Sequence, residues 1–213
     1  FQHETGAITQ YDMPQIMGSG ACLFDIDGDQ DLDILLIGGS SQPAGTTAGG
    51  NRLFRQEADG TFTDVTASSG LDSEGYGMGA AVGDIDNDGD LDLYLTRYGD
   101  DRLYRNNGQG EFEDITASSG IANPQWSTAA TFLDYDRDGW LDLFVVNYVD
   151  FFPGSICEDG SGRRDFCGPE SLAATADKFY RNTTGEAASG ASPAPSFEDI
   201  TVASGIATRS GKG

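Results

Sequence analysis

Basic residues are scarce in this chain of 213 residues, in which 12 Lys and Arg stand against 35 Asp and Glu for a net charge of −23. Such an acidic chain repels phosphate backbones and anionic lipids, which excludes nonspecific attraction to nucleic acid or membrane and favours cations or basic partners. No apolar run reaches the length of a transmembrane helix, so we expect no membrane insertion. Phe1 opens the chain without a signal peptide's basic and apolar stretches, as in a processed or trimmed chain.

Histidine and cysteine are equally rare. His3 is the only histidine, and we place it in a mobile tail; with no G-x-S-x-G motif or Cys/His pairing, we expect no enzyme. Cys157 and Cys167 bracket the polar loop CEDGSGRRDFC, where a disulfide would contribute roughly 3 kcal/mol in the chain-entropy model. The alternative is two unpaired surface thiols. The disulfide implies an oxidising compartment, hence a secreted, extracellular or periplasmic protein; Cys22 in ACLF is interpreted as a small buried side chain.

Two sequence blocks recur three times in the same order, which indicates a repeat protein. The acidic block begins at Asp25, Asp84 and Asp134 as DIDGDQDLD, DIDNDGDLD and DYDRDGWLD. The second block begins as NRLFR, DRLYR and DKFYR. An insertion of loop composition at 150–176 contains Cys157 and Cys167. We assign a single region over 1–213 with repeat units at about 18–71, 77–121 and 127–206.

Alternating apolar residues follow each acidic block and predict strands with one buried face. These residues are Leu91, Leu93 and Leu95 in the second unit and Leu141, Leu143 and Val145 in the third. About four such segments occur in each unit, and the 30 glycines suit tight turns between them. The sequence therefore predicts an all-β fold of β-propeller blades, each with four antiparallel strands. A stacked β-solenoid is the rival, but its repeats would be shorter and more uniform.

The number of units bears on the assembly. Propellers have about 4 to 8 blades, and three cannot close a ring. We therefore expect the chain to be a fragment of a larger propeller, with open blade edges through which it could self-associate.

Each acidic block carries carboxylates at positions 1, 3, 5 and 9, counted from its first aspartate. Position 7 varies and includes a tryptophan, so its backbone carbonyl is the simplest ligand there. An all-oxygen set of this size suits Ca²⁺ rather than Zn²⁺, which predicts about three calcium ions. Gly89 and Gly139 at position 6 permit a sharp turn, whereas the first loop has Gln30 there and Gly28 at position 4. The predicted ligands are Asp25, Asp27, Asp29, Asp31, Asp33, Asp84, Asp86, Asp88, Asp90, Asp92, Asp134, Asp136, Asp138, Trp140 and Asp142.

Two alternatives to a calcium loop fit the sequence less well. An EF-hand needs a Glu at position 12, where the chain has Leu36, Leu95 and Val145. Solvated turns without metal use Asp and Gly too, but they do not need four carboxylates at fixed odd positions in three units.

The motif D-x-D-x-D-G-x-x-D between blade strands resembles the FG-GAP or VCBS repeat, which also occurs in integrin α-subunit propellers. The N-terminal FQHETGAI, MGSG before the first loop, the DxTxxSG blocks and the CGP at Cys167–Pro169 are similar to the propeller of cartilage acidic proteins and their bacterial homologues, of the ASPIC/UnbV type. The resemblance implies a secreted, calcium-binding module for adhesion or protein contact, with a protein, matrix or cell-surface partner and no established catalytic centre to carry over. Gln30 departs from the pattern.

Other functions remain alternatives. The chain could be part of a secreted polysaccharide-active enzyme, or could bind carbohydrate through Tyr94, Tyr98, Trp126 or Tyr148, although packing between blades explains these aromatics better. The repeated arginines, from Arg52 to Arg181, are expected to pair with local acids. Asn182 begins the glycosylation sequon Asn-Thr-Thr.

Overall fold

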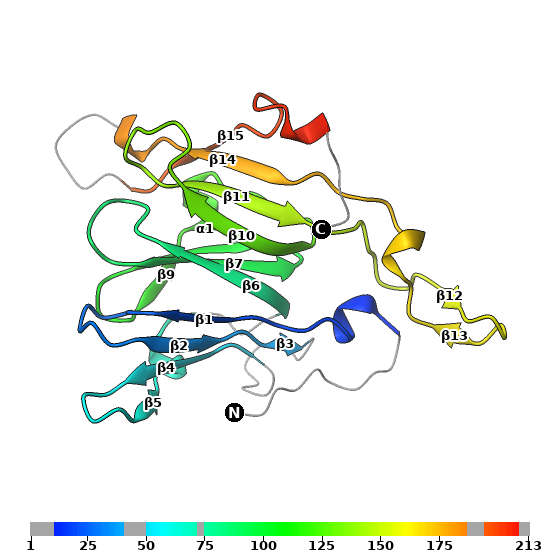
Figure 1. Cartoon of the computed structure of the whole chain (residues 1–213), viewed down its shortest axis with the longest axis horizontal. Coiled ribbons are helices and arrows are strands. Elements are labelled where there is room, and N and C mark those ends of the chain that lie inside the picture. Colours follow the sequence, from blue (N-terminus) through cyan, green and yellow to red (C-terminus); the bar gives the residue numbers. More distant parts are fainter. Residues whose placement is uncertain (1–10, 41–49, 72–74, 187–193, 209–213) are drawn as a thin grey trace.

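A computed structural model describes residues 11–40, 50–71, 75–186 and 194–208 of the chain. Three antiparallel sheets, one for each repeat unit and called blades 1 to 3, lie side by side (Figure 1). Blade 1 contains β1 (Ala21–Phe24), β2 (Asp33–Leu36), β4 (Arg52–Gln56) and β5 (Phe62–Asp64). Blade 2 contains β6 (Gly75–Gly83), β7 (Asp92–Tyr98), β8 (Arg102–Asn106) and β9 (Phe112–Asp114). Blade 3 contains β10 (Ser127–Leu133), β11 (Asp142–Asn147), β14 (Lys178–Asn182) and β15 (Phe197–Asp199).

The all-β prediction is confirmed, with four meandering strands per blade and no closed barrel among the described sheets. Short helices are confined to connections: η1 (Met13–Gln15), η2 (Thr66–Ser68), α1 (Thr116–Ser119), η3 (Pro169–Ser171), η4 (Thr184–Glu186) and η5 (Ile206–Thr208). One pairing was not predicted: β3 (Gly39–Ser40) leaves blade 1 and pairs with the start of β6 in blade 2. His3 and the FQHETGAI segment lie outside the described residues.

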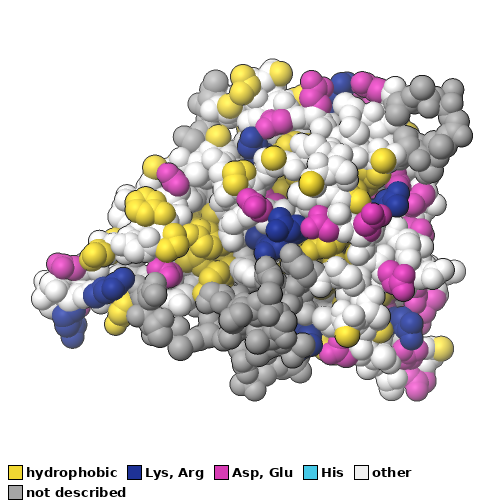
Figure 2. Space-filling model, turned by 180° about the vertical axis from the view of Figure 1, so that it is seen from behind, with side chains coloured by type: hydrophobic (Ala, Val, Ile, Leu, Met, Phe, Trp, Pro, Cys, Tyr) yellow, Lys and Arg dark blue, Asp and Glu magenta, His cyan; other side chains and the backbone are white. Residues whose placement is uncertain are grey.

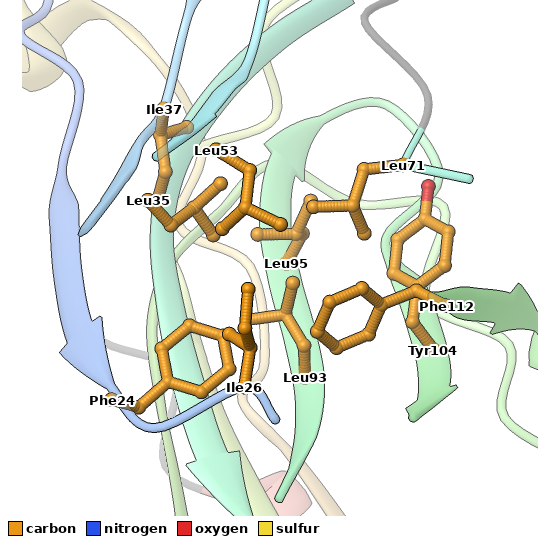
Figure 3. Packing of buried hydrophobic residues seen from close by; sticks show 10 residues of the cluster. All are labelled: Phe24, Ile26, Leu35, Ile37, Leu53, Leu71, Leu93, Leu95, Tyr104 and Phe112. Carbon is orange, nitrogen blue, oxygen red and sulfur yellow. The ribbon is translucent and has the colours of Figure 1, made fainter. Parts of the chain in front are cut away.

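The hydrophobic core lies between blades rather than inside one. Figure 3 shows side chains of blade 1, such as Leu35 and Leu53, facing Leu93 and Leu95 of blade 2. A second cluster repeats this arrangement between blades 2 and 3, where Tyr94 packs with the core around Leu143. The predicted apolar face of β7 is confirmed, because Leu93 and Leu95 pack against blade 1. The prediction of a single buried face is wrong for β7, because Tyr94 on its other face is also buried, against blade 3.

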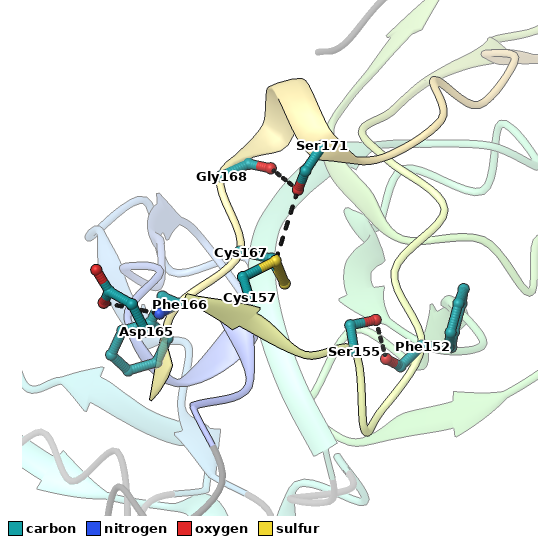
Figure 4. The surroundings of a disulfide bond; sticks show 8 residues. All are labelled: Phe152, Ser155, Cys157, Asp165, Phe166, Cys167, Gly168 and Ser171. Atoms are coloured by element: carbon teal, nitrogen blue, oxygen red, sulfur yellow. Dashed lines mark hydrogen bonds between the residues drawn. A yellow bond between two sulfur atoms is a disulfide. The ribbon is translucent and has the colours of Figure 1, made fainter. Parts of the chain in front are cut away.

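The predicted disulfide Cys157–Cys167 is present and closes a hairpin of β12 (Cys157–Glu158) and β13 (Arg164–Asp165) (Figure 4). This hairpin reaches the segment before blade 1, where the rings of Phe166 and Tyr11 lie 5.2 Å apart. Cys22 is half-buried and packs against the core between blades 1 and 2. Burial raises the pKa of its thiol, which fits a packing role.

A buried carboxylate joins blade 2 to blade 3. Asp101 is 1% exposed and accepts hydrogen bonds from the Tyr94 hydroxyl at 2.7 Å, the Arg97 backbone N–H at 2.8 Å, the Asn123 amide at 2.8 Å and the Ser127 hydroxyl. Burial raises the pKa of Asp101 to about 6 although these donors oppose the shift. At neutral pH the carboxylate is therefore ionised, and it fixes the connection into blade 3.

This pKa shift predicts a pH dependence of stability. Between the unfolded pKa near 4 and the folded value of about 6, the folded chain binds more protons, so the free energy of unfolding falls as pH rises. Asp101→Asn removes this titration. The stability of the natural chain relative to Asp101→Asn should therefore decrease by roughly 2 kcal/mol from pH 4 to pH 7. Urea unfolding of both proteins across this range measures the difference; one independent of pH would contradict the assignment.

Candidate metal centres

Each acidic block forms a loop between the first and second strands of its blade, wrapped around its own carboxylates. In loop 2 (84–92), Asp84 accepts the backbone N–H groups of Asp88 and Gly89, both at 3.1 Å. Asp88 in turn accepts the N–H of Asp90 at 2.9 Å. Loop 3 (134–142) repeats these three bonds with the same lengths. The odd spacing of the aspartates thus curls the chain and turns carboxylates toward one side.

The aspartate at position 9 holds the loop to the blade. In loop 2, Asp92 is fully buried, accepts the Ile85 N–H at 3.0 Å on one oxygen and accepts the Asn106 N–H at 2.9 Å on the other. Asp33 and Asp142 make the same two contacts in their own blades. Position 9 therefore connects the start of each loop to the third strand of the blade.

Carboxylates converge in all three loops, with ligand atoms within 4.8 Å of one another. Loop 1 (25–33) brings together Asp25, Asp27 and Asp29. Loops 2 and 3 bring together positions 1, 3 and 9 instead: Asp84, Asp86 and Asp92, and Asp134, Asp136 and Asp142. The remaining predicted carboxylates at positions 5 and 9 lie outside these triplets and serve the loop through the N–H groups they accept.

In loops 2 and 3, the side chain at position 7 lies against a turn of its own blade. The Asp90 carboxylate lies against Gly108, in the turn between the third and fourth strands of the same blade. Trp140 lies against Gly185 at the corresponding place in blade 3. This packing explains why position 7 accepts either residue type, and it is compatible with the predicted role of the backbone carbonyl.

Asp86 is the observation that a bound cation explains best. Its side chain is 4% exposed, and neither carboxylate oxygen has a hydrogen-bond partner within the described part of the chain. One oxygen of Asp27, at the same position in loop 1, is also buried and has no hydrogen-bond partner in the described segments. Because an unpaired buried carboxylate is costly, the loops fit a hard cation with oxygen ligands.

Electrostatics support the same conclusion. Burial, reinforced by the charge of Asp88, raises the pKa of Asp86 to about 6. Burial raises the pKa of Asp92 to about 7, against the two N–H groups it accepts. Burial also raises the pKa values of Asp27, Asp33 and Asp142. Like charges in a poorly solvated cluster oppose one another, and a divalent ion would relieve this repulsion.

Gln30 adopts the backbone conformation of the glycine that loops 2 and 3 have at position 6. Gly89 and Gly139 adopt φ of 97° and 89° there, and Gln30 adopts the same left-handed region with φ of 73°. Position 4 is left-handed as well, where loop 1 has Gly28 and the other loops have Asn87 and Arg137. Loop 1 therefore keeps the common path, with its glycine moved to the other left-handed position.

A family model described as FG-GAP-like repeat matches residues 25–95 and 86–145. These matches overlap and together span more than half of the chain. The chain belongs to the FG-GAP-like repeat family. Comparison with curated proteins found no match.

The FG-GAP-like repeat also explains the repeated side chains outside the loops. Arginines pair with nearby acids as predicted, for example Arg102 with Asp114 at 3.4 Å and Arg105 with Glu113 at 3.3 Å. Tyr94 and Trp126 are buried, whereas Tyr98 and Tyr148 pack against the cluster containing Trp126. These aromatics therefore serve packing.

The remaining surface is strongly acidic, and Figure 2 shows carboxylates spread over the face seen from behind. No helix among the described residues is long and apolar enough to cross a membrane. The disulfide and the FG-GAP-like repeats together indicate an extracellular or periplasmic protein.

The left-handed residue of loop 1 predicts a stabilising substitution. Gln30→Gly relieves the strain of a side chain at positive φ, and it should raise the free energy of unfolding by about 1 kcal/mol and the melting temperature by about 2–4 °C. The reciprocal Gly89→Gln should destabilise by a similar amount. Thermal melts in excess calcium measure both. A lower melting temperature for Gln30→Gly would show that Gln30 makes a contact that offsets its strain.

Proposed function

We propose that the chain is a calcium-binding β-propeller module that mediates protein contact outside the cytoplasm, and that it has no catalytic role. About three ions would be held, one by each of loops 1 to 3. The buried Asp86 carboxylate, whose two oxygens have no hydrogen-bond partner among the described residues, carries this proposal. The charge of Ca²⁺ would neutralise the cluster and supply the missing ligand contacts.

The role proposed for the ion is structural, and it follows from what the loop residues connect. Asp92 begins β7 and accepts an N–H from the end of β8, while Asp84 closes the loop that follows β6. The triplet Asp84, Asp86 and Asp92 therefore contacts the first three strands of blade 2 through a few bonds. A cation held by these residues would stabilise the blade and, through it, the interfaces on both sides.

Adhesion to a protein, matrix or cell-surface partner is the role proposed for the module as a whole. The family supports an interaction module, the disulfide supports an oxidising compartment, and the acidic surface favours basic partners. Membership in the ASPIC/UnbV-type group rests on the FQHETGAI, DxTxxSG and CGP segments. Self-association through open blade edges belongs to the same proposal, and sedimentation in calcium and after chelation tests it.

A catalytic role could rest on a cavity of about 630 Å³ lined by Asp100, Arg102 and Asp114 among others. Its ion pair, however, is a repeat feature, because Arg52 pairs with Asp64 in blade 1 and Lys178 with Asp199 in blade 3. A pair that recurs in every blade is better explained as structural. Polysaccharide-degrading activity in a direct assay would overturn the noncatalytic proposal.

Chelation should lower the melting temperature substantially. If each site has the millimolar to submillimolar affinity of extracellular modules, 10 mM calcium adds about 1.4–2.7 kcal/mol per site. Three sites would then raise the melting temperature by on the order of 10 °C or more. Calorimetry with excess calcium or excess chelator, together with the metal content of the purified chain, provides the measurement. Identical melting curves would refute the proposal.

The effect of Asp86→Asn on stability should differ in sign between calcium-free and calcium-containing solution. Without calcium it removes a buried charge and should stabilise the chain, whereas in calcium it removes a ligand and should reduce the calcium-dependent gain by about one third. Asp100→Asn, at an exposed acid outside the loops, is the matched control and should do neither. Destabilisation by Asp86→Asn in both conditions would point to a hydrogen-bonding role for the carboxylate.

A further inference from the structure

A buried asparagine joins the metal loops of consecutive blades. Asn106, at the end of β8 in blade 2, is 2% exposed, and its side-chain amide donates two hydrogen bonds. One reaches the Leu91 carbonyl of its own loop 2 at 3.2 Å. The other reaches the Ile26 carbonyl of loop 1, in the preceding blade, at 2.9 Å. A single amide group thus contacts two loops that are distant in sequence.

Blade 3 repeats this arrangement independently. Asn182, at the end of β14, is 1% exposed and donates to the Leu141 carbonyl of loop 3 at 3.0 Å and to the Ile85 carbonyl of loop 2 at 2.8 Å. Its own oxygen accepts the Thr184 N–H at 2.9 Å. The Asn182 nitrogen is therefore fully used inside the fold, and a glycan on the predicted sequon is incompatible with this packing.

The carbonyl that receives the amide lies next to a metal ligand. Ile26 and Ile85 occupy position 2, and their carbonyls belong to the peptide groups that lead into Asp27 and Asp86 at position 3. The N–H of each isoleucine is bonded to the position 9 aspartate of the same loop. The N–H of the position 2 residue is thereby held by its own loop, and its carbonyl is held by the next blade. The backbone that leads into the aspartate at position 3 is therefore fixed in orientation.

Loop 3 provides the internal contrast. Among the described residues, no side-chain amide donates to the carbonyl of Tyr135, its position 2 residue. Asp136 at position 3 is exposed, whereas Asp86 in loop 2 is buried. The hairpin turn of blade 2 also covers loop 1, because Gly110 lies against the Ile26 side chain with no room for a Cβ. In loop 1, the following blade thus both covers the loop and bonds the carbonyl of its position 2 residue, Ile26.

We propose that Asn106 and Asn182 couple the calcium sites of consecutive blades, so that each site depends on the blade that follows it. This inference rests on the proposed calcium binding. Asn106 positions the ligands of loops 1 and 2, and Asn182 those of loops 2 and 3. Ion binding and blade packing then reinforce each other, as linkage requires when one state favours both.

The test is a calcium titration followed by ¹⁵N NMR of the loop amides, including Gln30, Gly89 and Gly139, in the natural chain and two variants. Asn106→Ala should weaken calcium binding at loops 1 and 2 by about tenfold and leave loop 3 unchanged, because one hydrogen bond per loop is lost. Asn182→Ala should weaken loops 2 and 3 and leave loop 1 unchanged. Gln109→Ala, which removes an exposed amide side chain in the same hairpin, is the control and should change none.

Each outcome distinguishes the two proposals. An Asn106→Ala effect confined to loop 2, or equal at all three loops, would overturn the coupling and leave calcium binding intact. No calcium response in the natural chain would overturn the proposed function itself. Asn106→Gln keeps both donors and should restore most of the affinity.

Should the alanine variants fail to fold, Asp88→Asn offers a second test with both asparagines intact. With loop 2 weakened, calcium filling of loop 1 should still shift the side-chain amide signal of Asn106. An unmoved Asn106 signal during filling of loop 1 would overturn the coupling.

Discussion

The buried aspartate at position 9 is the constraint on which each blade depends. Asp33, Asp92 and Asp142 receive one N–H from their own loop and one from the third strand, with both oxygens engaged. The second strand begins at this residue in every blade, so its start is fixed relative to the loop and to the third strand. Register follows from this anchor, because a shift by one residue would expose the apolar face and bury a polar one.

The same anchor creates the electrostatic problem that the loops must resolve. Two N–H groups do not offset the burial of a carboxylate that has further carboxylates within a few ångströms, and burial raises the pKa of Asp92 to about 7. Asp86 adds a second buried charge with no hydrogen-bond partner among the described residues. Protonation or a cation can relieve this arrangement, and only a cation does so without giving up ligands at neutral pH.

Much of this architecture follows from local pattern, and the rest does not. Period-two alternation after DIDNDGDLD predicts the strands and their buried faces, and the repeated loop predicts the carboxylate clusters. The sequence did not reveal the bonds between blades. Asn106 and Asn182 follow the similar segments RLYR and KFYR, a recurrence that could have marked them, but an asparagine before a turn is also ordinary turn chemistry. Likewise, the pairing of β3 with β6 and the four donors around Asp101 depend on chain segments brought together only by packing.

Cohesion in this chain is therefore of the nearest-neighbour kind found in repeat proteins. Apolar clusters lie between successive blades, and the polar contacts cross the same interfaces, from Asn106 to Ile26 and from Asn182 to Ile85. A blade cannot bury its second face alone, and its loop cannot fix position 2 alone. Because both needs are met by the same neighbour, packing of the apolar faces and ordering of the loop carboxylates occur together. The interface between blades, rather than the single blade, is thus the unit in which this fold gains its stability.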